Sequence, residues 1–141
     1  MAAVARYLVD RSALARAADP TVAEVLAPML EAGVLALCGV VELEVLYSAR
    51  NGRDHRQMRS ELESGFEWLS TTDEDFQRAA EVQGLLATKG SHRAVSIADL
   101  LIAAVAERHR LPVLHYDGDF DLISDHTAQP VHWVVPRGSV P

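Results

Sequence analysis

Short apolar segments alternate with longer segments of helical pattern along almost the whole chain, and this alternation limits the fold more than any other feature. Most of the apolar segments are rich in Val and Leu, as strands buried on both faces of a sheet are. They span residues 5–10, 34–39, 67–70, 111–117 and 131–135. Strands separated by helices run in the same direction, so we expect an α/β protein with a central, mostly parallel sheet covered by helices.

The segments between the strand candidates carry the patterns and boundary residues of helices. Helices are expected over residues 12–18, 19–33, 40–52, 54–66, 71–90, 96–110 and 120–126. Pro28 should kink or split the second of these helices, and Gly52 should close the third. Thr72 and Asp75 have the spacing of a capping box at the start of the fifth.

Length and composition fit a single globular domain. A chain of 141 residues, 49% of them apolar, can bury a sizeable core. We expect one domain over residues 1–136 and a C-terminal tail over residues 137–141, whose order is left open. No stretch approaches the ~20 apolar residues of a membrane-spanning helix, and Arg6 and Asp10 interrupt the N-terminal apolar run. We therefore expect a cytoplasmic protein without a membrane anchor.

The few sulfur and imidazole ligands exclude several kinds of metal and redox site. Cys38 is the only cysteine, so the chain has neither an internal disulfide nor a zinc site made of several cysteines. The six histidines show no spacing typical of metal ligands. A metal in this protein would have to bind to oxygen.

The charge balance argues against non-specific coating of nucleic acid. The net charge is −7, whereas that mode of binding releases phosphate counterions with Lys and Arg. A local basic path remains compatible with this total. Arg50, Arg53, Arg56 and Arg59 recur every third residue and suit either phosphate contact or a solvated helix face balanced by nearby acids. The sequence leaves both interpretations open.

Carboxylates gather where two strand candidates end. The stretch "LHYDGDFDLI", residues 114–123, carries Asp117, Asp119 and Asp121 at alternate positions without a basic residue among them, and Asp10 follows the first strand candidate. Like charges at this spacing repel one another, so they require a cation, a dipole or water nearby. Since ligands of open parallel sheets bind beyond the carboxyl ends of the strands, Asp10 and Asp117 should face one crevice.

Two further acids begin helices, and each acid also has a structural explanation. Asp99 lies in the first turn of its helix, where it could be the partner of Ser96 in a capping box. Asp10 could cap the helix that starts near Ser12, and Asp117 with Gly118 could form a turn. A turn, however, leaves Asp119 and Asp121 unexplained.

Glu42 and Glu44 both follow the second strand candidate. They stand about 200° apart around a helix, so at most one should face the crevice. Helix geometry does not decide which.

Convergent carboxylates are the ligands that Mg²⁺ and Mn²⁺ prefer. Such a site suits phosphoryl chemistry, in which water attacks phosphorus and an oxygen leaves in line with it. An EF-hand loop starting at Asp117 is excluded, because Leu122 and Ala128 replace its required Gly and Glu. An aspartyl-phosphate phosphatase also places Asp-x-Asp after a strand, but it needs a lysine downstream, and Lys89 lies upstream.

Four motifs in order, "YLVDRSAL", "ELEVLYSA", "SIADLLIAAVA" and "VLHYDGDFDLI", resemble those of the PIN-domain ribonucleases, specifically the VapC-type toxins of bacterial toxin–antitoxin pairs. The resemblance spans nearly the whole chain. It implies an α/β/α sandwich, RNA cleavage dependent on Mg²⁺ or Mn²⁺, and inhibition by a VapB-type antitoxin. It also implies a homodimer that forms a heterotetramer or a larger complex with the antitoxin.

By position, the resemblance assigns the catalytic acids of that family to Asp10, Glu44, Asp99, Asp117 and Asp119. It places the metal ligands at Asp10, Asp99 and Asp117, selects Glu44 over Glu42, and leaves Asp121 to cap a helix. Ser12 matches a small hydroxyl residue of the family, and Arg11 before it is unusual. Two alternatives are a nuclease-inactive interaction module that keeps this fold and, less strongly, an aspartate-based phosphatase.

Overall fold

The computed structural model describes residues 4–141 and contains one five-stranded, wholly parallel sheet. Its strands are β1 (Tyr7–Val9), β2 (Leu35–Cys38), β3 (Glu67–Leu69), β4 (Val113–His115) and β5 (Val131–Trp133). The order across the sheet is β3-β2-β1-β4-β5. Leu8 of β1 aligns with Ala36 on one side and with Val113 on the other. The predicted α/β class and parallel sheet are confirmed.

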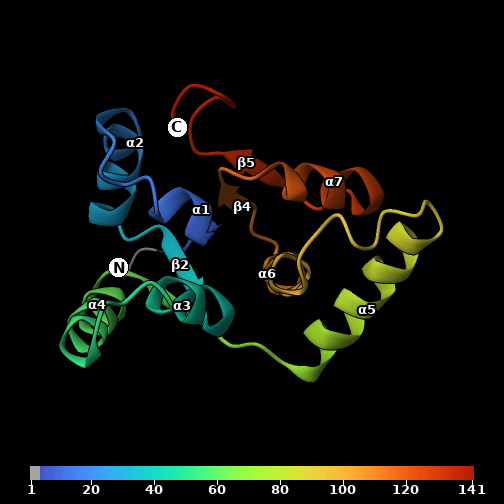
Figure 1. The fold of residues 1–141 in the computed structure, drawn as a ribbon, viewed down its shortest axis with the longest axis horizontal. Coiled ribbons are helices and arrows are strands. Elements are labelled where there is room, and N and C mark those ends of the chain that lie inside the picture. The colour runs from blue at the N-terminus through green and yellow to red at the C-terminus, as the bar shows by residue number, and fades with distance from the viewer. Residues whose placement is uncertain (1–3) are drawn as a thin grey trace.

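Seven helices cover this sheet in the described part of the chain, giving the expected α/β/α sandwich (Figure 1). They are α1 (Arg11–Leu14), α2 (Pro20–Glu31), α3 (Gly39–Leu46), α4 (Gly52–Gly65), α5 (Asp73–Ala87), α6 (Ile97–His109) and α7 (Gly118–Thr127). Figure 1 views α6 along its axis at the centre of the molecule, between α3 and α7, with α5 beyond it. No helix within residues 4–141 is both long and apolar enough to cross a bilayer.

The core lies between the sheet and α6. All four residues of β2 and all three of β4 are buried, because strands at the centre of a parallel sheet have helices on both faces. Residues 99–106 of α6 are buried without interruption, so this helix is apolar on every side. The fully buried Ile102 and Val105 fix the helix in the core, and its amino end is therefore held firmly in place.

Several element boundaries differ from the predicted ones. Helix α1 begins at Arg11, one residue before the predicted start, and Asp10 caps it, because its carboxylate accepts the N–H of Ser12. Helix α2 continues through Pro28 to Glu31, since the proline removes only one helical hydrogen bond near the end. Gly52 begins α4 instead of closing α3, because Asn51 caps the new helix by accepting the N–H of Asp54.

The capping box of Thr72 and Asp75 at the start of α5 is confirmed. At α6 only half of the box forms: the Ser96 hydroxyl accepts the N–H of Asp99. The Asp99 side chain is 5% exposed and lies among other carboxylates. Its position is therefore not explained by capping.

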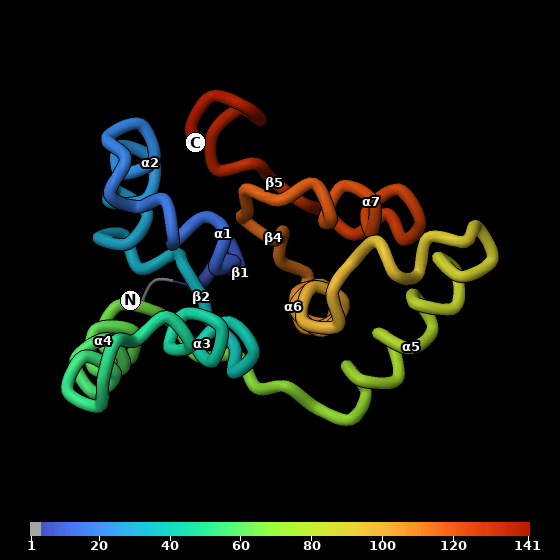
Figure 2. Tube along the Cα trace, in the orientation of Figure 1, coloured from blue at the N-terminus to red at the C-terminus, as the bar shows by residue number. Residues whose placement is uncertain are grey.

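The end of the chain turns back toward the segment that follows α1, and Figure 2 shows it as a loop between α2 and β5. Arg16 Nε donates to the carbonyl oxygen of Pro141 at 3.0 Å, and the Tyr116 hydroxyl donates to that of Val140 at 2.8 Å. These contacts place the last residues beside the carboxyl end of β4. The division at residue 136 into domain and tail stays a prediction.

The strand order reverses between β1 and β4, because β2 and β3 extend the sheet on one side and β4 and β5 on the other. Such a switch point opens a crevice at the carboxyl ends of the two central strands. Asp10 follows β1 and Asp117 lies two residues beyond β4. The fold therefore brings the first and last acidic motifs to one place.

Candidate metal centre

Asp10 both caps a helix and faces the crevice. Its Oδ2 accepts the backbone N–H of Ser12 at 2.9 Å, whereas its buried Oδ1 has no hydrogen-bond partner. Burial raises the pKa of the Asp10 carboxyl, although hydrogen bonds from Ser12 act in the opposite direction. The two interpretations that the sequence offered for Asp10 are thus compatible, one for each oxygen.

Asp117 has the same double position at the other central strand. It caps α7, with Oδ1 accepting the N–H of Asp119 at 2.9 Å. Asp119, in the first turn of α7, shares a hydrogen bond with Asp99. The alternate spacing of these acids therefore directs both toward α6.

Asp99 lies at the centre of the site. It comes within 4.8 Å of Asp10 and Glu44 in one group of ligand oxygens, and of Asp117 and Asp119 in a second. Burial, followed by the charge of Asp10 and a hydrogen bond to Asp119, raises the pKa of Asp99 to about 8. Without a cation, this carboxyl is therefore largely protonated at neutral pH.

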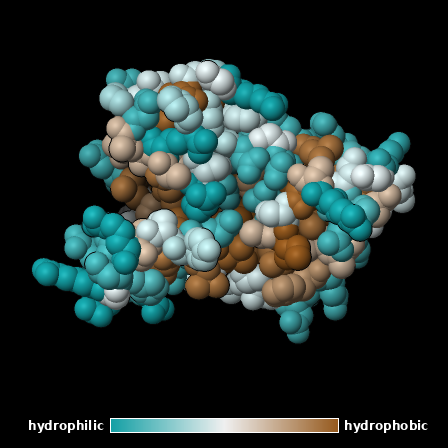
Figure 3. All heavy atoms as spheres, viewed as in Figure 1, coloured by the Kyte–Doolittle hydropathy of each residue, from teal (hydrophilic) through white to brown (hydrophobic). Residues whose placement is uncertain are grey.

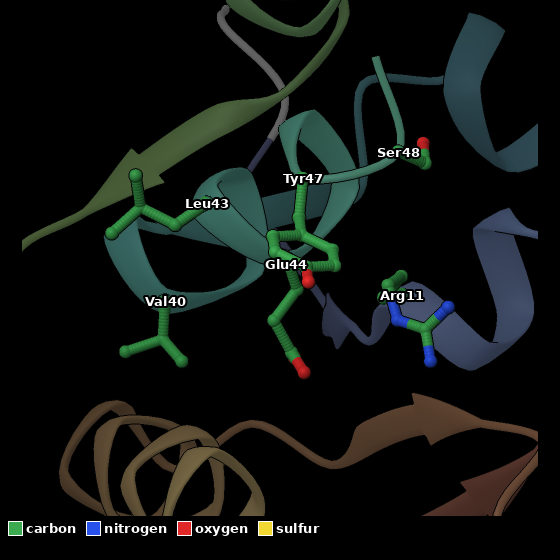
Figure 4. Close-up of a pocket in the computed structure, with 6 residues that line it drawn as sticks. All are labelled: Arg11, Val40, Leu43, Glu44, Tyr47 and Ser48. Carbon is green, nitrogen blue, oxygen red and sulfur yellow. The ribbon is translucent and has the colours of Figure 1, made fainter. Parts of the chain in front are cut away.

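Glu44 enters the crevice from α3. Figure 4 shows its side chain and that of Arg11 directed into the same space between α3 and α6. Its buried Oε1 has no hydrogen-bond partner, and burial followed by the charge of Asp10 raises its pKa. The choice of Glu44 over Glu42 agrees with this position, because Glu42 instead forms an ion pair with Arg59 at 3.4 Å.

These residues fit a hard divalent cation. The ligands are all carboxylate oxygens, two of those buried oxygens have no donor, and burial, together with repulsion between the carboxylates, raises the pKa values of Asp10, Glu44 and Asp99. A bound cation would relieve each of these costs at once. The structure brings together all five acids that the resemblance assigned: Asp10, Glu44, Asp99, Asp117 and Asp119.

Asp121 has a different role from the helix cap that was expected. Its carboxylate accepts the indole N–H of Trp133 at 3.0 Å and so links α7 to β5. Asp117 performs the capping instead.

His115 is a residue of the site that sequence reasoning missed. It is fully buried at the end of β4, and its Nδ1 accepts the backbone N–H of Asp117 at 3.1 Å. Burial lowers its pKa to about 4, so the ring is neutral at pH 7 and Nδ1 can act as an acceptor. Its place two residues before Asp117, in an otherwise apolar strand, was the available signal.

The arginines spaced along residues 50–59, in and just before α4, are partly explained by ion pairs. Arg50 lies 3.4 Å from Asp54, and Arg59 lies 3.4 Å from both Glu42 and Glu63. For these two residues the structure favours the solvated helix face over phosphate contact.

Comparison with known proteins identifies the family. The family model of the PIN domain matches residues 7–125. Ribonuclease VapC21 of Mycobacterium tuberculosis is 48% identical over 134 residues, covering 95% of this chain and 97% of its own. Ribonuclease VapC51 of the same organism is 44% identical over 135 residues, covering 96% and 97%.

Among solved structures, VapBC2 from Rickettsia felis bound to a DNA fragment from its promoter has a TM-score of 0.73 at 14% identity. The match covers 92% of this chain and 98% of that one, and supports the fold alone. The carboxylate centre at the switch point, the family match and the two long alignments agree, and the chain belongs to the PIN-domain family, among the VapC proteins.

Proposed function

We propose that the protein is a Mg²⁺- or Mn²⁺-dependent endoribonuclease toxin that hydrolyses RNA phosphodiester bonds in the cytoplasm. The observation that carries the proposal is that two clusters of three acidic residues lie at the switch point of the sheet and share Asp99. The names of the two Mycobacterium tuberculosis relatives support the ribonuclease activity.

Asp10, Asp99 and Asp117 would hold the cation, and Glu44 and Asp119 would complete the acidic pocket. The metal would lower the pKa of an attacking water and neutralise charge on the phosphate oxygens. The chain supplies the positioning: backbone N–H groups fix one oxygen each of Asp10 and Asp117, at the ends of the two central strands. The Oε1 of Glu44, which has no donor, is available to accept a hydrogen bond from water.

A VapB-type antitoxin is the protein partner that we infer, together with a homodimer that forms a heterotetramer or larger complex with it. Titles of structural neighbours, such as the VapBC2 complex, name such pairs. This chain exposes large apolar side chains on α3, α5 and α6, namely Leu43, Tyr47, Phe76 and Ile97. Figure 3 shows apolar surface over the same part of the molecule. Surfaces of this kind mark sites of protein association.

The antitoxin would inhibit by placing a basic side chain, most favourably Arg, among the carboxylates in place of the metal. Co-expression with the antitoxin should then restore growth of cells that produce the toxin. If a co-purified partner has no basic residue within reach of Asp10 or Asp99, this mode of inhibition is wrong.

The activity is tested with purified protein and a mixture of cellular RNAs. We expect cleavage with Mg²⁺ or Mn²⁺, little with Ca²⁺, whose looser coordination suits in-line displacement less well, and none after chelation with EDTA. RNA cleavage by the metal-free protein would remove the metal from the mechanism. A protein that binds the antitoxin but cleaves no RNA with any of these ions would be an inactive interaction module.

A further inference from the structure

A second cavity adjoins the acidic centre and has the opposite charge. It has a volume of about 520 Å³ and lies where α1, the end of β4, β5 and the C-terminal residues meet. Its lining includes Arg11, Arg16, Tyr116, Asp117, Trp133 and Arg137. Because Asp117 belongs to both, the basic cavity opens directly beside the carboxylates.

The three arginines of this cavity have no Asp or Glu side chain as an ion-pair partner in the described residues, although Arg16 donates to the oxygens of Pro141 and Ser12. Within residues 4–141, none of Arg11, Arg16 and Arg137 forms an ion pair with Asp or Glu, in contrast to Arg50 and Arg59. On a chain with a net charge of −7, this is a local concentration of unpaired positive charge. An anionic ligand would supply the missing partner.

Aromatic rings hold two of the guanidinium groups. Arg16 lies 4.5 Å from the ring centroid of Tyr116, and Arg137 lies 5.6 Å from that of Trp133. The two rings pack edge to face at 5.3 Å and form one support. A planar guanidinium restrained in this way loses less entropy when it binds a phosphate.

Gly118 lets Arg137 come close to the catalytic side of the cavity. A Cβ atom at Gly118 would lie 3.4 Å from one terminal nitrogen of Arg137, so the guanidinium lies against the backbone next to Asp117. Arg11 reaches the same region from the other direction, since it also lines the space in front of Glu44 (Figure 4). Positive groups therefore border the acidic centre on two sides.

We propose that this arginine cavity binds the phosphate groups of the RNA chain next to the bond that is cleaved. The inference rests on the proposed ribonuclease function and names its substrate-positioning site. A polyanion is repelled by a cluster of five carboxylates, so the flanking phosphates need cations beside that cluster. Arginine forks form charge-assisted hydrogen bonds with phosphate oxygens. Arg11, Arg16 and Arg137 position the substrate and take no part in bond breaking.

The main test is binding of a fluorescently labelled single-stranded RNA to the full-length protein in EDTA, measured by anisotropy at several salt concentrations. Arg137→Gln is the principal variant, because Arg137 is exposed and its side chain forms no hydrogen bond within residues 4–141. We expect roughly three- to tenfold weaker binding and a salt dependence that is less steep by about 0.7 for one lost phosphate contact. Arg11→Gln should act in the same direction.

Arg6→Gln is the matched control. Arg6 is exposed and precedes the amino end of β1, whereas the cavity lies at the carboxyl ends of the strands, so this variant removes the same charge away from the cavity. It should bind RNA as the wild type does. In cleavage assays with Mg²⁺, Arg137→Gln should raise KM with little change in kcat, because it removes an interaction made equally in ground and transition states.

The outcomes separate the two proposals. If Arg137→Gln and Arg11→Gln bind RNA with the affinity and salt dependence of the wild type, the cavity does not bind RNA, even if the wild type cleaves it. If these variants lose affinity for the antitoxin alone, the occupant is an acidic segment of a protein, and the proposal is overturned. If they lose RNA affinity while the wild type cleaves no RNA, the cavity proposal stands and the ribonuclease proposal fails.

Discussion

The backbone N–H of Tyr116 donates a hydrogen bond to the hydroxyl oxygen of Ser12 at 2.8 Å. The backbone N–H of Ser12 in turn donates to Oδ2 of Asp10 at 2.9 Å. Ser12 lies in α1 after strand β1, whereas Tyr116 follows β4. One buried hydroxyl therefore joins the ends of the two central strands and fixes the separation of the acids that follow them.

Ser12→Ala should reduce both stability and cleavage. The partly buried N–H of Tyr116 loses its acceptor, which costs ~1–3 kcal/mol, and the link that fixes Asp10 relative to the end of β4 is lost. Ser12→Thr keeps the hydroxyl and should restore most of both properties. Ser48→Ala is the control, because that exposed hydroxyl bonds only to the carbonyl of Val45. Both variants would be compared by urea unfolding and by RNA cleavage. If Ser12→Ala behaves like Ser48→Ala in both measurements, the Ser12 hydroxyl has no such role.

The metal-free protein should become less stable as the pH rises from 6.5 to 8. The pKa of Asp99 is raised from 3.8 to about 8, so the folded state holds a proton that the unfolded state has released. The stability due to this proton is present below pH 4 and is lost as the pH approaches 8. Below pH 6.5 the lowered pKa of His115 has the opposite effect on stability. The imidazole of the unfolded state is protonated below this pH, whereas that of the folded state stays neutral down to about pH 4.

The measurement is the melting temperature in EDTA between pH 6.5 and 8, with and without Mn²⁺. Metal binding to the folded state should offset the loss at pH 8. A melting temperature that is constant or rises over this range, without metal, would show that the acidic cluster is not under electrostatic strain.

Asp99→Asn should stabilise the metal-free protein and abolish its function. The amide cannot ionise, so the repulsion from Asp10 disappears, and it can still donate a hydrogen bond to Asp119. At pH 8 we expect a melting temperature roughly 3 °C or more above that of the wild type, and no difference at pH 4. This reverses the ~0.3–1 kcal/mol loss that follows if Asp99 only interacts with the helix dipole.

Cleavage and metal affinity should both fall by orders of magnitude in Asp99→Asn. Asp121→Asn is the comparison, because Asp121 binds Trp133 away from the cluster, and its cleavage should stay close to that of the wild type. Normal cleavage by Asp99→Asn would leave the helix-start interpretation as the sole role of Asp99.

The sequence predicted the fold and the grouping of the acids because both depend on repeating local patterns. Apolar segments that alternate with capped helices specify a parallel sheet, and Asp10 and Asp117 follow the strands that such a sheet places together. The basic cavity could not be predicted in this way. Arg137 lies more than a hundred residues after Arg11 and Arg16, and only the fold of the C-terminal residues brings it to them.

The same limit explains the errors at single residues. The pairs Ser96/Asp99 and Thr72/Asp75 have the same spacing at the start of a helix. The sequence therefore does not distinguish an acid that only caps its helix from one that also faces the crevice. Asp121 was assigned to capping because it stands in a helical first turn, whereas its partner Trp133 is supplied by another strand. Local patterns therefore identify the type of residue needed at a position, and tertiary contacts decide its role.

His115→Phe should loosen the Asp117 end of the site. Phenylalanine fits the aromatic surroundings formed by Phe120 and Trp133, but it cannot accept the N–H of Asp117. Leaving that donor without a partner costs ~1–3 kcal/mol, and the orientation of Asp117 becomes less fixed. We expect a lower melting temperature and weaker Mn²⁺ binding, with His115→Asn less affected in both. Mn²⁺ affinity equal to the wild type in His115→Phe would contradict a positioning role.

Glu44→Gln and Glu42→Gln together distinguish the loss of a site residue from the loss of one negative charge on α3. Both variants change the same residue type on α3 and remove one negative charge. Glu44 lies with Asp10 and Asp99, so its loss should reduce cleavage at least tenfold, in line with the loss of one preorganised polar group in an active site (roughly 10²–10³-fold in comparable cases). It should also raise stability at pH 8 slightly, because a partly buried carboxylate whose Oε1 has no donor is removed.

Glu42 instead lies against Arg59, whose side chain is 56% exposed. Removing this pair should cost at most ~1 kcal/mol and leave cleavage close to that of the wild type. The two variants are compared by unfolding in urea and by cleavage of one RNA under the same conditions. If Glu42→Gln were inactive while Glu44→Gln cleaved RNA normally, the assignment of the α3 acid would be reversed, and the cluster around Asp99 would have to act without its α3 member.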